Sequence, residues 1–505
     1  MKFGLSLFAF ISLTLSVNAE LRLPSIVGDH MVLQRDLELP IWGWADPGAA
    51  VTVTFNGQTL QGKAAENGRW EVKLAPMTGS SHALRMTISS GGEQRVLSNI
   101  VIGEVWVCSG QSNMQWTVSS SFDADLEKAS ANYPNIRLIT VPQLGTQEIQ
   151  DDFRGQWEIC TPDTVGDFSG VGFFFGRQLQ QVLGVPIGLI DNAWGGSAAE
   201  AWVRRDVLEK DGRFDAYIAE WKAKEESFDW DAIQADYKKK VAAAKAAGKP
   251  NPRAPRNDMA GQHRPGNLWA GVLNPIIGYG IRGTVWYQGE SNAARASLYD
   301  DLFGLMITEW RKAWGQGDFP FYWVQLADYR DETDVAGDSQ WAELRESQTK
   351  TLELPNTGQA VIYDIGEGRD IHPRDKQNVG RRLARIALAK DYGMAIPYQS
   401  PSYKSMEVKG NKATLTFENV GSTLYTFDTK DAKGFAIAGA DKQWHWAEGK
   451  VLGKDRVEVW SDKVEAPVAV RYAWSDNPVA NLRSRENLPV VPFRTDDWTG
   501  VTEAQ

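Results

Sequence analysis

The sequence has few of the residues that stabilise small exported domains or bind metals. Only two cysteines occur among 505 residues, which excludes a disulfide framework and a cysteine-rich zinc site. Cys108 and Cys160 can form at most one bridge in an oxidising compartment. Free thiols are slightly favoured, because Cys108 ends a predicted buried strand and buried free cysteines are common. With five histidines, few candidates exist for a general base.

Basic residues are in the minority, and long apolar runs are missing after the first 20 residues. Residues 1–19 have the pattern of a signal peptide: Lys2, the apolar stretch Phe3–Leu15 and the small residues before Ala19. No later run is long enough to span a membrane. We therefore expect a periplasmic or secreted protein without an integral membrane segment after signal removal. Loss of Lys2 leaves 53 of the 54 basic residues against 64 acidic ones, a net charge near −11, which argues against a nucleic-acid partner.

The hydrophobic pattern divides residues 20–505 into three parts. Short alternating runs such as Ala50–Phe55 predict an N-terminal β-sandwich-like module over residues 20–100. Residues 101–397 alternate strands with helices, which is typical of a parallel sheet covered by helices on both faces. A charged stretch at about 204–265 predicts a helical insertion in this part. From 398 to 505, a second β module and a tail are expected.

The central part is predicted to contain five strands and four covering helices. The strands are Ile102–Val107, Pro186–Ile190, Gly283–Tyr287, Phe319–Gln325 and Gln359–Asp364. The helices are Phe173–Leu183, Ser297–Trp314, Trp341–Leu352 and Pro373–Tyr392.

A serine follows the first of these strands, in the stretch Gly110-Gln111-Ser112-Asn113. A glycine and a serine at the end of a buried strand suit a sharp turn that holds the Ser112 hydroxyl at the carboxyl edge of the sheet. Open α/β folds bind their ligands at this edge. Taken alone, the stretch fits an ordinary turn equally well. A serine hydroxyl also needs an imidazole to accept its proton before it can act as a nucleophile.

His372 is the histidine best placed to be that base. It follows the last predicted strand and precedes Pro373, which suits the first position of a helix. It would then lie at the same edge as Ser112, although a helix-capping or surface histidine is the alternative. Asp370 lies two residues earlier, so in an extended segment its carboxylate projects to the same side and can orient the imidazole.

Two further loops at this edge offer N–H donors. A tetrahedral acyl intermediate carries negative charge on oxygen, and preorganised donors must meet it. Asn292 offers a side-chain amide, and Gly195-Gly196 offers unobstructed backbone N–H groups. Each signal is weak alone, but four loops at one predicted edge strengthen one another.

Four blocks of the sequence resemble the sialate O-acetylesterase family, which belongs to the SGNH hydrolase superfamily. The blocks are Gly110–Met114, Trp194–Ser197, Trp286–Asn292 and Asp370–Pro373, and the resemblance extends to Met31–Arg35 and Leu488–Thr495. It covers nearly the whole chain after the signal peptide. With the strand–helix rhythm, it implies an α/β fold with an SGNH-type, flavodoxin-like parallel sheet of five strands, flanked by the two β modules.

The resemblance also implies roles for individual residues. Ser112 would be the nucleophile and His372 the base. The oxyanion site would comprise the Ser112 N–H, the Gly196 N–H and the Asn292 side chain. No metal or organic cofactor is implied.

The chain departs from the superfamily pattern at the third member of the triad. The aspartate usually stands three residues before the histidine, where this chain has Arg369. Asp370 is then the best orienting group, with Glu367, Asp364 or a backbone carbonyl as substitutes.

Glu290 permits another interpretation. Paired with Glu367 or Asp364, it would resemble the acid of a glycoside hydrolase. Its position in the third block instead favours a supporting role, together with Gln111, in ordering the oxyanion loop. We therefore expect a serine esterase that removes O-acetyl groups from sugars through an acetyl-enzyme intermediate. The resemblance suggests O-acetylated sialic acid as the substrate, with acetylated xylan or another polysaccharide as the alternative.

Two proposals from other classes remain open. One is a glycoside hydrolase that uses Glu290, and the other is a non-catalytic carbohydrate-binding protein. The sequence makes no prediction of the oligomeric state.

Overall fold

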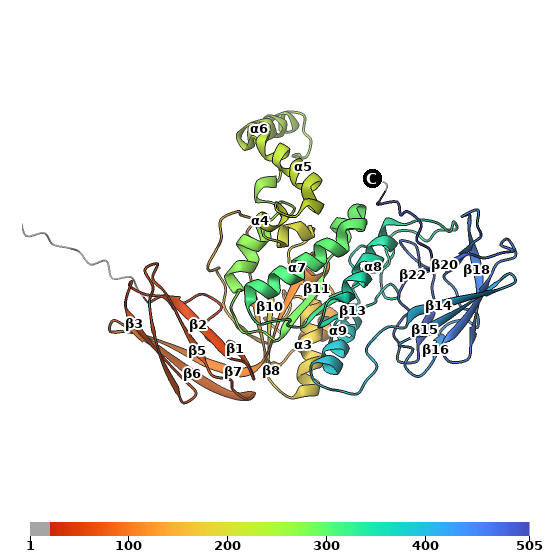
Figure 1. The fold of residues 1–505 in the computed structure, drawn as a ribbon. Coiled ribbons are helices and arrows are strands. Elements are labelled where there is room, and N and C mark those ends of the chain that lie inside the picture. Colours follow the sequence, from red (N-terminus) through yellow and green to blue (C-terminus); the bar gives the residue numbers. More distant parts are fainter. Residues whose placement is uncertain (1–20, 504–505) are drawn as a thin grey trace, which may run out of the picture.

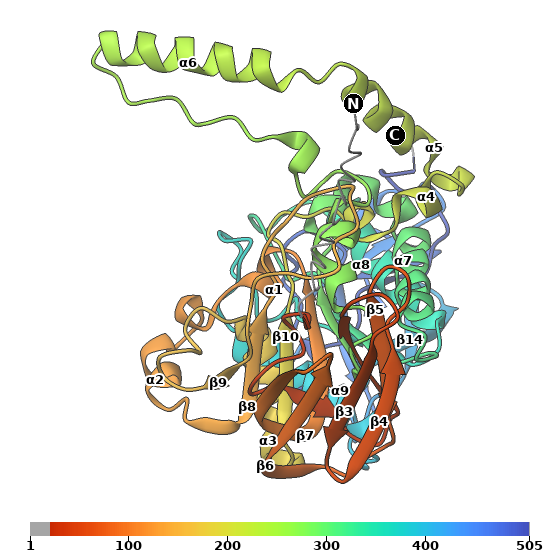
Figure 2. The same cartoon turned by 90° about the vertical axis from the view of Figure 1, so that its left-hand side faces the viewer.

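The computed structural model describes residues 21–503, so the predicted signal peptide lies outside the described residues. Three parts follow one another along the molecule: an N-terminal β part, a central α/β part and a C-terminal β part (Figure 1). The helices α5 (Asp215–Glu226) and α6 (Trp230–Ala246) form an arm that projects from the central part (Figure 2). None of the helices between residues 21 and 503 is long and apolar enough to cross a membrane.

The central sheet has the strand order β13-β12-β11-β7-β10-β8-β9. Neighbouring strands from β13 to β8 are parallel, and β9 joins antiparallel at the edge. The bounds are β7 (Glu93–Gly110), β8 (Tyr133–Thr140), β9 (Glu158–Cys160), β10 (Ile187–Asp191), β11 (Gly283–Tyr287), β12 (Phe321–Val324) and β13 (Thr357–Ala360).

All five predicted central strands overlap observed strands, although Gln359–Asp364 shares only its first two residues with β13. Five is also too few, because six neighbouring strands are parallel. The parallel strand β8 was missed because Pro134 and Asn135 near its start are depleted in strands and read as a turn.

Two layers of helices cover this sheet. The helices α3 (Gly170–Leu183) and α9 (Lys376–Lys390) pack on one face, against side chains such as Trp106 and Leu189. On the other face, α7 (Tyr299–Trp314) and α8 (Gln340–Lys350) pack against side chains that include Val107 and Trp286. Successive strand residues point to opposite faces, so the strands are apolar on both sides.

The four predicted helices are therefore confirmed, with starts that differ by one to three residues. Helix α9 begins at Lys376 and not at Pro373, because the Asp375 side chain caps it by accepting a hydrogen bond from the Asn378 N–H at 3.0 Å. His372 accordingly lies on a loop. The remaining α-helices are short: α1 (Ser112–Gln115), α2 (Ala124–Ala129) and α4 (Arg205–Leu208).

The N-terminal part is joined to the central sheet by one continuous strand. The first half of β7 pairs antiparallel with β6, and the second half pairs parallel with β10 and β11. The predicted boundary at residues 100 and 101 falls inside this strand. A single apolar cluster also runs from the N-terminal strands into the central part. The other strands are β1 (Val32–Gln34), β2 (Leu39–Trp44), β3 (Ala50–Phe55), β4 (Gln58–Lys63), β5 (Arg69–Leu74) and β6 (Ser80–Ser90).

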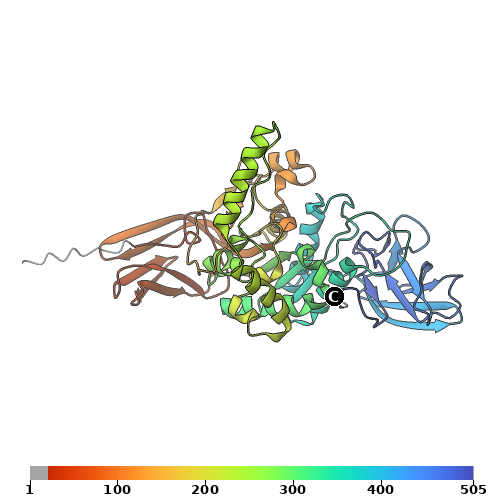
Figure 3. The ribbon, with the colours of Figure 1, turned by 90° about the horizontal axis from the view of Figure 1, so that it is seen from above.

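The C-terminal part is an antiparallel sheet with the order β14-β15-β19-β18-β17-β20-β22, seen from above in Figure 3. Its apolar cluster includes Val361 and Tyr363, which leave the central sheet after β13. The C-terminal strands are β14 (Ser402–Lys409), β15 (Lys412–Glu418), β16 (Leu424–Thr426), β17 (Phe435–Ala438), β18 (Trp444–Leu452), β19 (Arg456–Trp460), β20 (Ala469–Tyr472), β21 (Leu482–Ser484) and β22 (Phe493–Arg494).

Candidate active site

The predicted nucleophile follows a turn that only glycine permits. At Gly110, the last residue of β7, φ is +136°, and a Cβ atom would lie 2.2 Å from the Tyr287 carbonyl oxygen on β11. The next N–H, that of Gln111, donates to the same oxygen at 2.9 Å. Ser112 then begins α1, at the carboxyl edge of the parallel sheet.

The predicted base lies on the loop between β13 and α9. Asp370 Oδ1 is 3.4 Å from His372 Nδ1 and accepts the His372 backbone N–H at 2.9 Å. Asp370 therefore faces one ring nitrogen, which leaves Nε2 for a proton from serine. Burial lowers the pKa of His372, and the charge of Asp370 opposes part of this effect. The imidazole is consequently neutral at pH 7 and able to accept a proton.

The substitutes for Asp370 have other partners. Glu367 binds the Arg374 guanidinium at 3.0 Å, and Asp364 binds Arg382 at 2.6 Å. Asp364 is nearly inaccessible, with a side chain 4% exposed. Asp370 is thus the carboxylate in contact with His372.

Ser112 and His372 line the same cavity of about 540 Å³, which we call the serine cavity. Trp116 also lines it and stacks on His372, with ring centroids 4.5 Å apart. Asp167 and Asp191 also line this cavity, and no lysine or arginine among the described residues does. The cavity therefore joins a serine and a neutral imidazole beside an aromatic surface.

A buried polar network lies behind the two residues. Asn113 accepts a hydrogen bond from Lys376 Nζ at 2.6 Å, and its amide nitrogen donates to Glu290 at 2.6 Å and to the Ile371 carbonyl at 2.9 Å. Asn113 is adjacent to Ser112 and Ile371 is adjacent to His372. One amide thus connects the serine turn to the histidine loop.

Burial shifts the pKa values of Lys376 and Glu290 in the directions that favour their neutral forms. Burial lowers the pKa of Lys376 to about 7, although the Glu290 charge opposes the shift. Burial likewise raises the pKa of Glu290, against the effect of its bond to Asn113. One carboxyl oxygen of Glu290 is buried without a hydrogen-bond partner among the described residues. Glu290 does not line the serine cavity and acts through its neighbours.

Of the loops predicted to form the oxyanion site, the glycine pair lies beside the serine, whereas the Asn292 amide contacts other residues. A Cβ atom on Gly195 would lie 3.4 Å from Ser112 Cβ, and the Gly195 N–H donates to Gln115 at 2.7 Å. Gly196 has a left-handed backbone conformation, with φ of +72°. The Asn292 amide nitrogen donates to Glu200 at 2.9 Å. The roles of Gly196 and Asn292 in an oxyanion site therefore stay predictions.

Gln111 holds the loop that precedes Asn292. Its side-chain oxygen accepts the backbone N–H groups of Gly289 at 3.3 Å and Ser291 at 3.4 Å. The serine turn and the Glu290 loop are therefore joined by side-chain as well as strand contacts.

Sequence analysis missed several residues of this site. Asp191 ends β10, lines the serine cavity and accepts the Ala193 N–H at 3.1 Å, and burial raises its pKa to about 7. Because Asp191 directly follows the predicted strand Pro186–Ile190, the sequence could have indicated it as a residue of the site. Trp116 lies just beyond the first block, whereas nothing local distinguishes Lys376 from other helix lysines.

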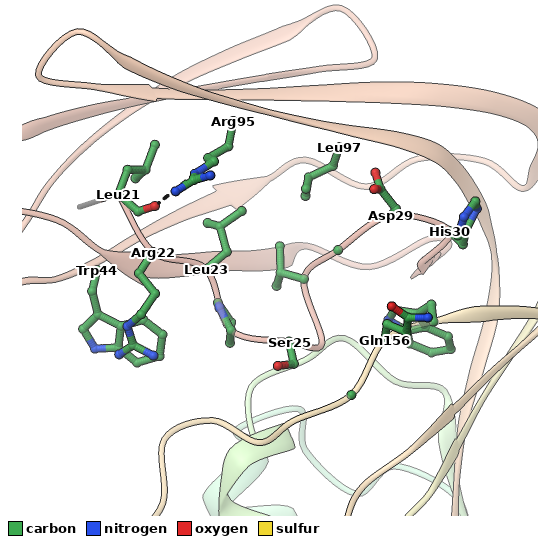
Figure 4. Close-up of a pocket in the computed structure, with 15 residues that line it drawn as sticks. Leu21, Arg22, Leu23, Ser25, Asp29, His30, Trp44, Arg95, Leu97 and Gln156 are labelled. Carbon is green, nitrogen blue, oxygen red and sulfur yellow. Dashed lines mark hydrogen bonds between the residues drawn. The ribbon is translucent and has the colours of Figure 1, made fainter.

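A second cavity, of about 760 Å³, lies between the N-terminal part and residues 155–157 of the central part, and contains none of the predicted site residues (Figure 4). The Arg22 guanidinium lies 3.6 Å from the centre of the Trp44 ring. The same guanidinium pairs with Asp152 at 3.4 Å. Since an arginine occupies this face of the indole, the Trp44 face is not open to a sugar ring.

Neither cysteine forms a disulfide. Cys108 and Cys160 are both buried free thiols. Within residues 21–503, no group of three or more histidine, cysteine, aspartate or glutamate side chains is arranged to hold a metal ion.

Comparison with known proteins identifies the family. The model of the carbohydrate esterase family described as sialic acid-specific acetylesterase matches residues 102–235 and 272–389. Mouse sialate O-acetylesterase is 31% identical to this chain over 97% of each chain. The human sialate O-acetylesterase is 30% identical, over 94% of this chain and 92% of its own length. The chain belongs to this carbohydrate esterase family.

A solved structure supports the same assignment. A carbohydrate acetylesterase from Xanthomonas citri has 37% sequence identity and a TM-score of 0.81, and the match covers 95% of this chain and all of that one. The chain is accordingly a carboxylic ester hydrolase, as its sequence predicted.

Proposed function

We propose that this carbohydrate esterase removes O-acetyl groups from sugars through an acetyl-enzyme intermediate. Ser112 Oγ attacks the acetyl carbonyl while His372 Nε2 accepts its proton. The tetrahedral intermediate collapses, and the sugar hydroxyl leaves with that proton. Water then attacks the acetyl-serine, again with His372 as base, and releases acetate. Asp370 orients the imidazole, while Gly196 and Asn292 supply oxyanion donors.

One observation carries this proposal. Ser112 and His372, which are 260 residues apart in the sequence, line a single open cavity, and Asp370 lies beside Nδ1 of His372, which leaves Nε2 for the serine proton. The lowered pKa of His372 supports its role as a base at neutral pH.

The names of the relatives support acetylated sialic acid as a substrate. The charge of the serine cavity favours a second candidate, an acetylated neutral sugar such as the acetylated xylose units of xylan. Sialic acid carries a carboxylate, whereas the serine cavity contains Asp167 and no lysine or arginine to pair with that carboxylate. The like charge of Asp167 disfavours an anionic sugar, while the raised pKa of Asp191, about 7, leaves that side chain partly neutral at pH 7.

The Xanthomonas citri relative, named a carbohydrate acetylesterase, is compatible with both substrates. Acetate release from O-acetylated sialic acid and from acetylated xylan, compared under one condition, distinguishes the two.

Two variants test the mechanism. We expect the wild-type protein to release acetate from p-nitrophenyl acetate and from an acetylated sugar, and Ser112→Ala to lose at least 99% of this activity. Full activity in Ser112→Ala would remove Ser112 from the mechanism. If Glu290→Gln abolished release of free sugar while Ser112→Ala did not, the protein would be a glycoside hydrolase. Binding to glycans with release of neither acetate nor sugar would indicate a non-catalytic binding protein.

We further propose an SGNH-type central domain and export from the cytoplasm. The first is supported by the four sequence blocks, which lie at or after the carboxyl ends of β7, β10 and β11 and in the loop between β13 and α9. The second is supported by the sequence of residues 1–19. Analysis of the mature N-terminus of the protein recovered from culture medium or periplasm would test export.

A further inference from the structure

A third cavity, with aromatic walls, lies where the C-terminal sheet meets the central part. Its volume is about 360 Å³, within the range of clefts that hold small ligands. We call it the C-terminal cavity, and its lining includes Thr333, Phe435, Trp446, Glu448, Trp474 and Asn477. Neither Ser112 nor His372 lines it, so it is separate from the serine cavity.

Trp446 provides an exposed and fixed aromatic surface in this cavity. It is 39% exposed, whereas Phe435 and Trp474 are 1% and 4% exposed. The Trp446 indole N–H donates to the Asp334 carbonyl at 2.8 Å, which fixes the orientation of the ring. An indole anchored by its polar edge, with its face open, suits the apolar face of a sugar ring.

Charged side chains at the rim supply partners for hydroxyl groups. Asp431, Lys433 and Glu448 line the C-terminal cavity and are exposed. Within residues 21–503, none of the three has an ion pair or side-chain hydrogen bond. Their carboxylates accept hydrogen bonds and the ammonium group donates them, so all three are available to sugar hydroxyls.

The backbone of the cavity is also strained. Ala473, a lining residue, has φ of +51°, and its N–H donates to the Gly434 carbonyl at 2.9 Å. A left-handed conformation at a residue other than glycine costs on the order of 1–3 kcal/mol and is concentrated at ligand-binding sites.

The C-terminal cavity is connected to the edge of the sheet that carries the catalytic residues. Thr333 and Asp334 belong to the loop that leaves the carboxyl end of β12. Asn477 donates to the Arg330 carbonyl at 2.8 Å, and the Arg330 N–H donates to the carbonyl of Gly368, which precedes His372 by four residues. The C-terminal cavity is therefore linked by hydrogen bonds to the loop that carries His372.

We propose that the C-terminal cavity is a second carbohydrate-binding site, which holds a sugar ring of a glycan chain on Trp446. Glu448, Asp431 and Lys433 bind its hydroxyl groups. The site increases the affinity for oligomeric and polymeric substrates and takes no part in the chemistry. It binds glycans whether or not they are acetylated.

A glycan array of xylan, mannan, glucan and sialylated oligosaccharides would identify the ligand, and titration calorimetry of the full chain with the strongest binder would measure it. We expect Trp446→Ala to weaken Kd at least tenfold and Trp446→Phe, which keeps an aromatic face, to weaken it less. Phe427→Ala is the matched control, because Phe427 is a 55% exposed aromatic residue of the same part and does not line the cavity. Its Kd should stay within twofold of wild type.

Kinetics provide an independent measurement. For an acetylated polymer of the sugar that binds, Trp446→Ala should raise KM at least tenfold with little change in kcat, whereas a loss of kcat alone would indicate a structural effect. If Trp446→Ala does not fold, Glu448→Gln replaces it, with an expected Kd at least threefold weaker. The proposal is overturned if no oligosaccharide binds, or if both variants bind as wild type does. The two proposals can fail separately. If the wild-type protein released no acetate but bound glycans, and Trp446→Ala lost this binding, the proposed esterase mechanism would be refuted while the proposed binding site would be supported.

Discussion

The indole of Trp116 lies flat on the imidazole of His372, with ring centroids 4.5 Å apart and planes 9° apart. The indole N–H donates to the Ser120 carbonyl at 2.8 Å, which keeps the ring in this position. The face of an aromatic ring attracts a cation. In the proposed mechanism, in which His372 takes the proton of Ser112, the stacked Trp116 would therefore stabilise the imidazolium that forms.

Replacement of Trp116 should slow the chemical step. An exposed cation–π contact contributes about 0.5–1 kcal/mol, so we expect Trp116→Ala to lower kcat for p-nitrophenyl acetate about two- to fivefold. Trp116→Phe retains a stacked ring and should lose less. Equal losses in both variants, or a change confined to KM, would contradict a role in stabilising the imidazolium.

The pH dependence of kcat/KM should report the His372–Asp370 pair. Because burial lowers the pKa of His372, activity should be half-maximal below pH of about 6.5, the ordinary value of histidine. The Asp370 charge raises this pKa, so Asp370→Asn should move the acid limb to lower pH and also reduce kcat. Glu367→Gln is the control, since Glu367 binds Arg374, and its acid limb should not move. A shift of the Asp370→Asn limb to higher pH would show that Asp370 does not act on His372.

Replacement of Asn113 by aspartate should lower both the stability and the activity of the protein. In Asn113→Asp, the amide donor to Glu290 and to the Ile371 carbonyl is lost, and a second acid faces Glu290. We expect a loss of about 1–3 kcal/mol in the free energy of unfolding and a fall of about 100-fold in kcat, because the serine and histidine loops separate. Asn132→Asp, an exposed control, should change neither. Urea denaturation and esterase assays measure both effects, and a stable, active Asn113→Asp would argue against the network.

The two thiols should be unreactive in the folded protein. Burial raises the pKa of Cys108 well above its usual range and that of Cys160 to about 12, and the thiolate is the reactive form. Ellman's reagent should therefore detect almost no thiol in native protein and two after denaturation. Zero thiols in denatured, unreduced protein would reveal a disulfide.

The sequence was most informative where an apolar run is continuous and bounded. Gly283–Tyr287 was predicted as a strand and forms β11 with the same limits. Parallel strands end at one edge, so the positions of Ser112 and His372 followed from the order of strands and helices. Strand β8 was not recognised, because part of it lacks the apolar pattern on which this reasoning depends.

The buried polar network behind Ser112 and His372 could not be predicted from the sequence, for a different reason. Lys376 meets Asn113 across 263 residues, and this contact depends on how α9 packs beside the end of β7. Periodicity indicates that a helix face is buried but does not specify which lysine reaches which amide. The same applies to Asn292, whose amide was predicted from its loop but whose bond to Glu200 requires the folded structure.

The continuity of β7 has a consequence for how this enzyme can be divided. Ser112 stands two residues beyond a strand that begins inside the N-terminal part, and both halves of that strand share one apolar cluster. Recombination that replaced residues 20–100 with an unrelated module would break the ladder between β6 and β7 and remove part of the shared apolar cluster. The N-terminal part therefore supports the strand that leads to Ser112, and it cannot be exchanged as a separate module.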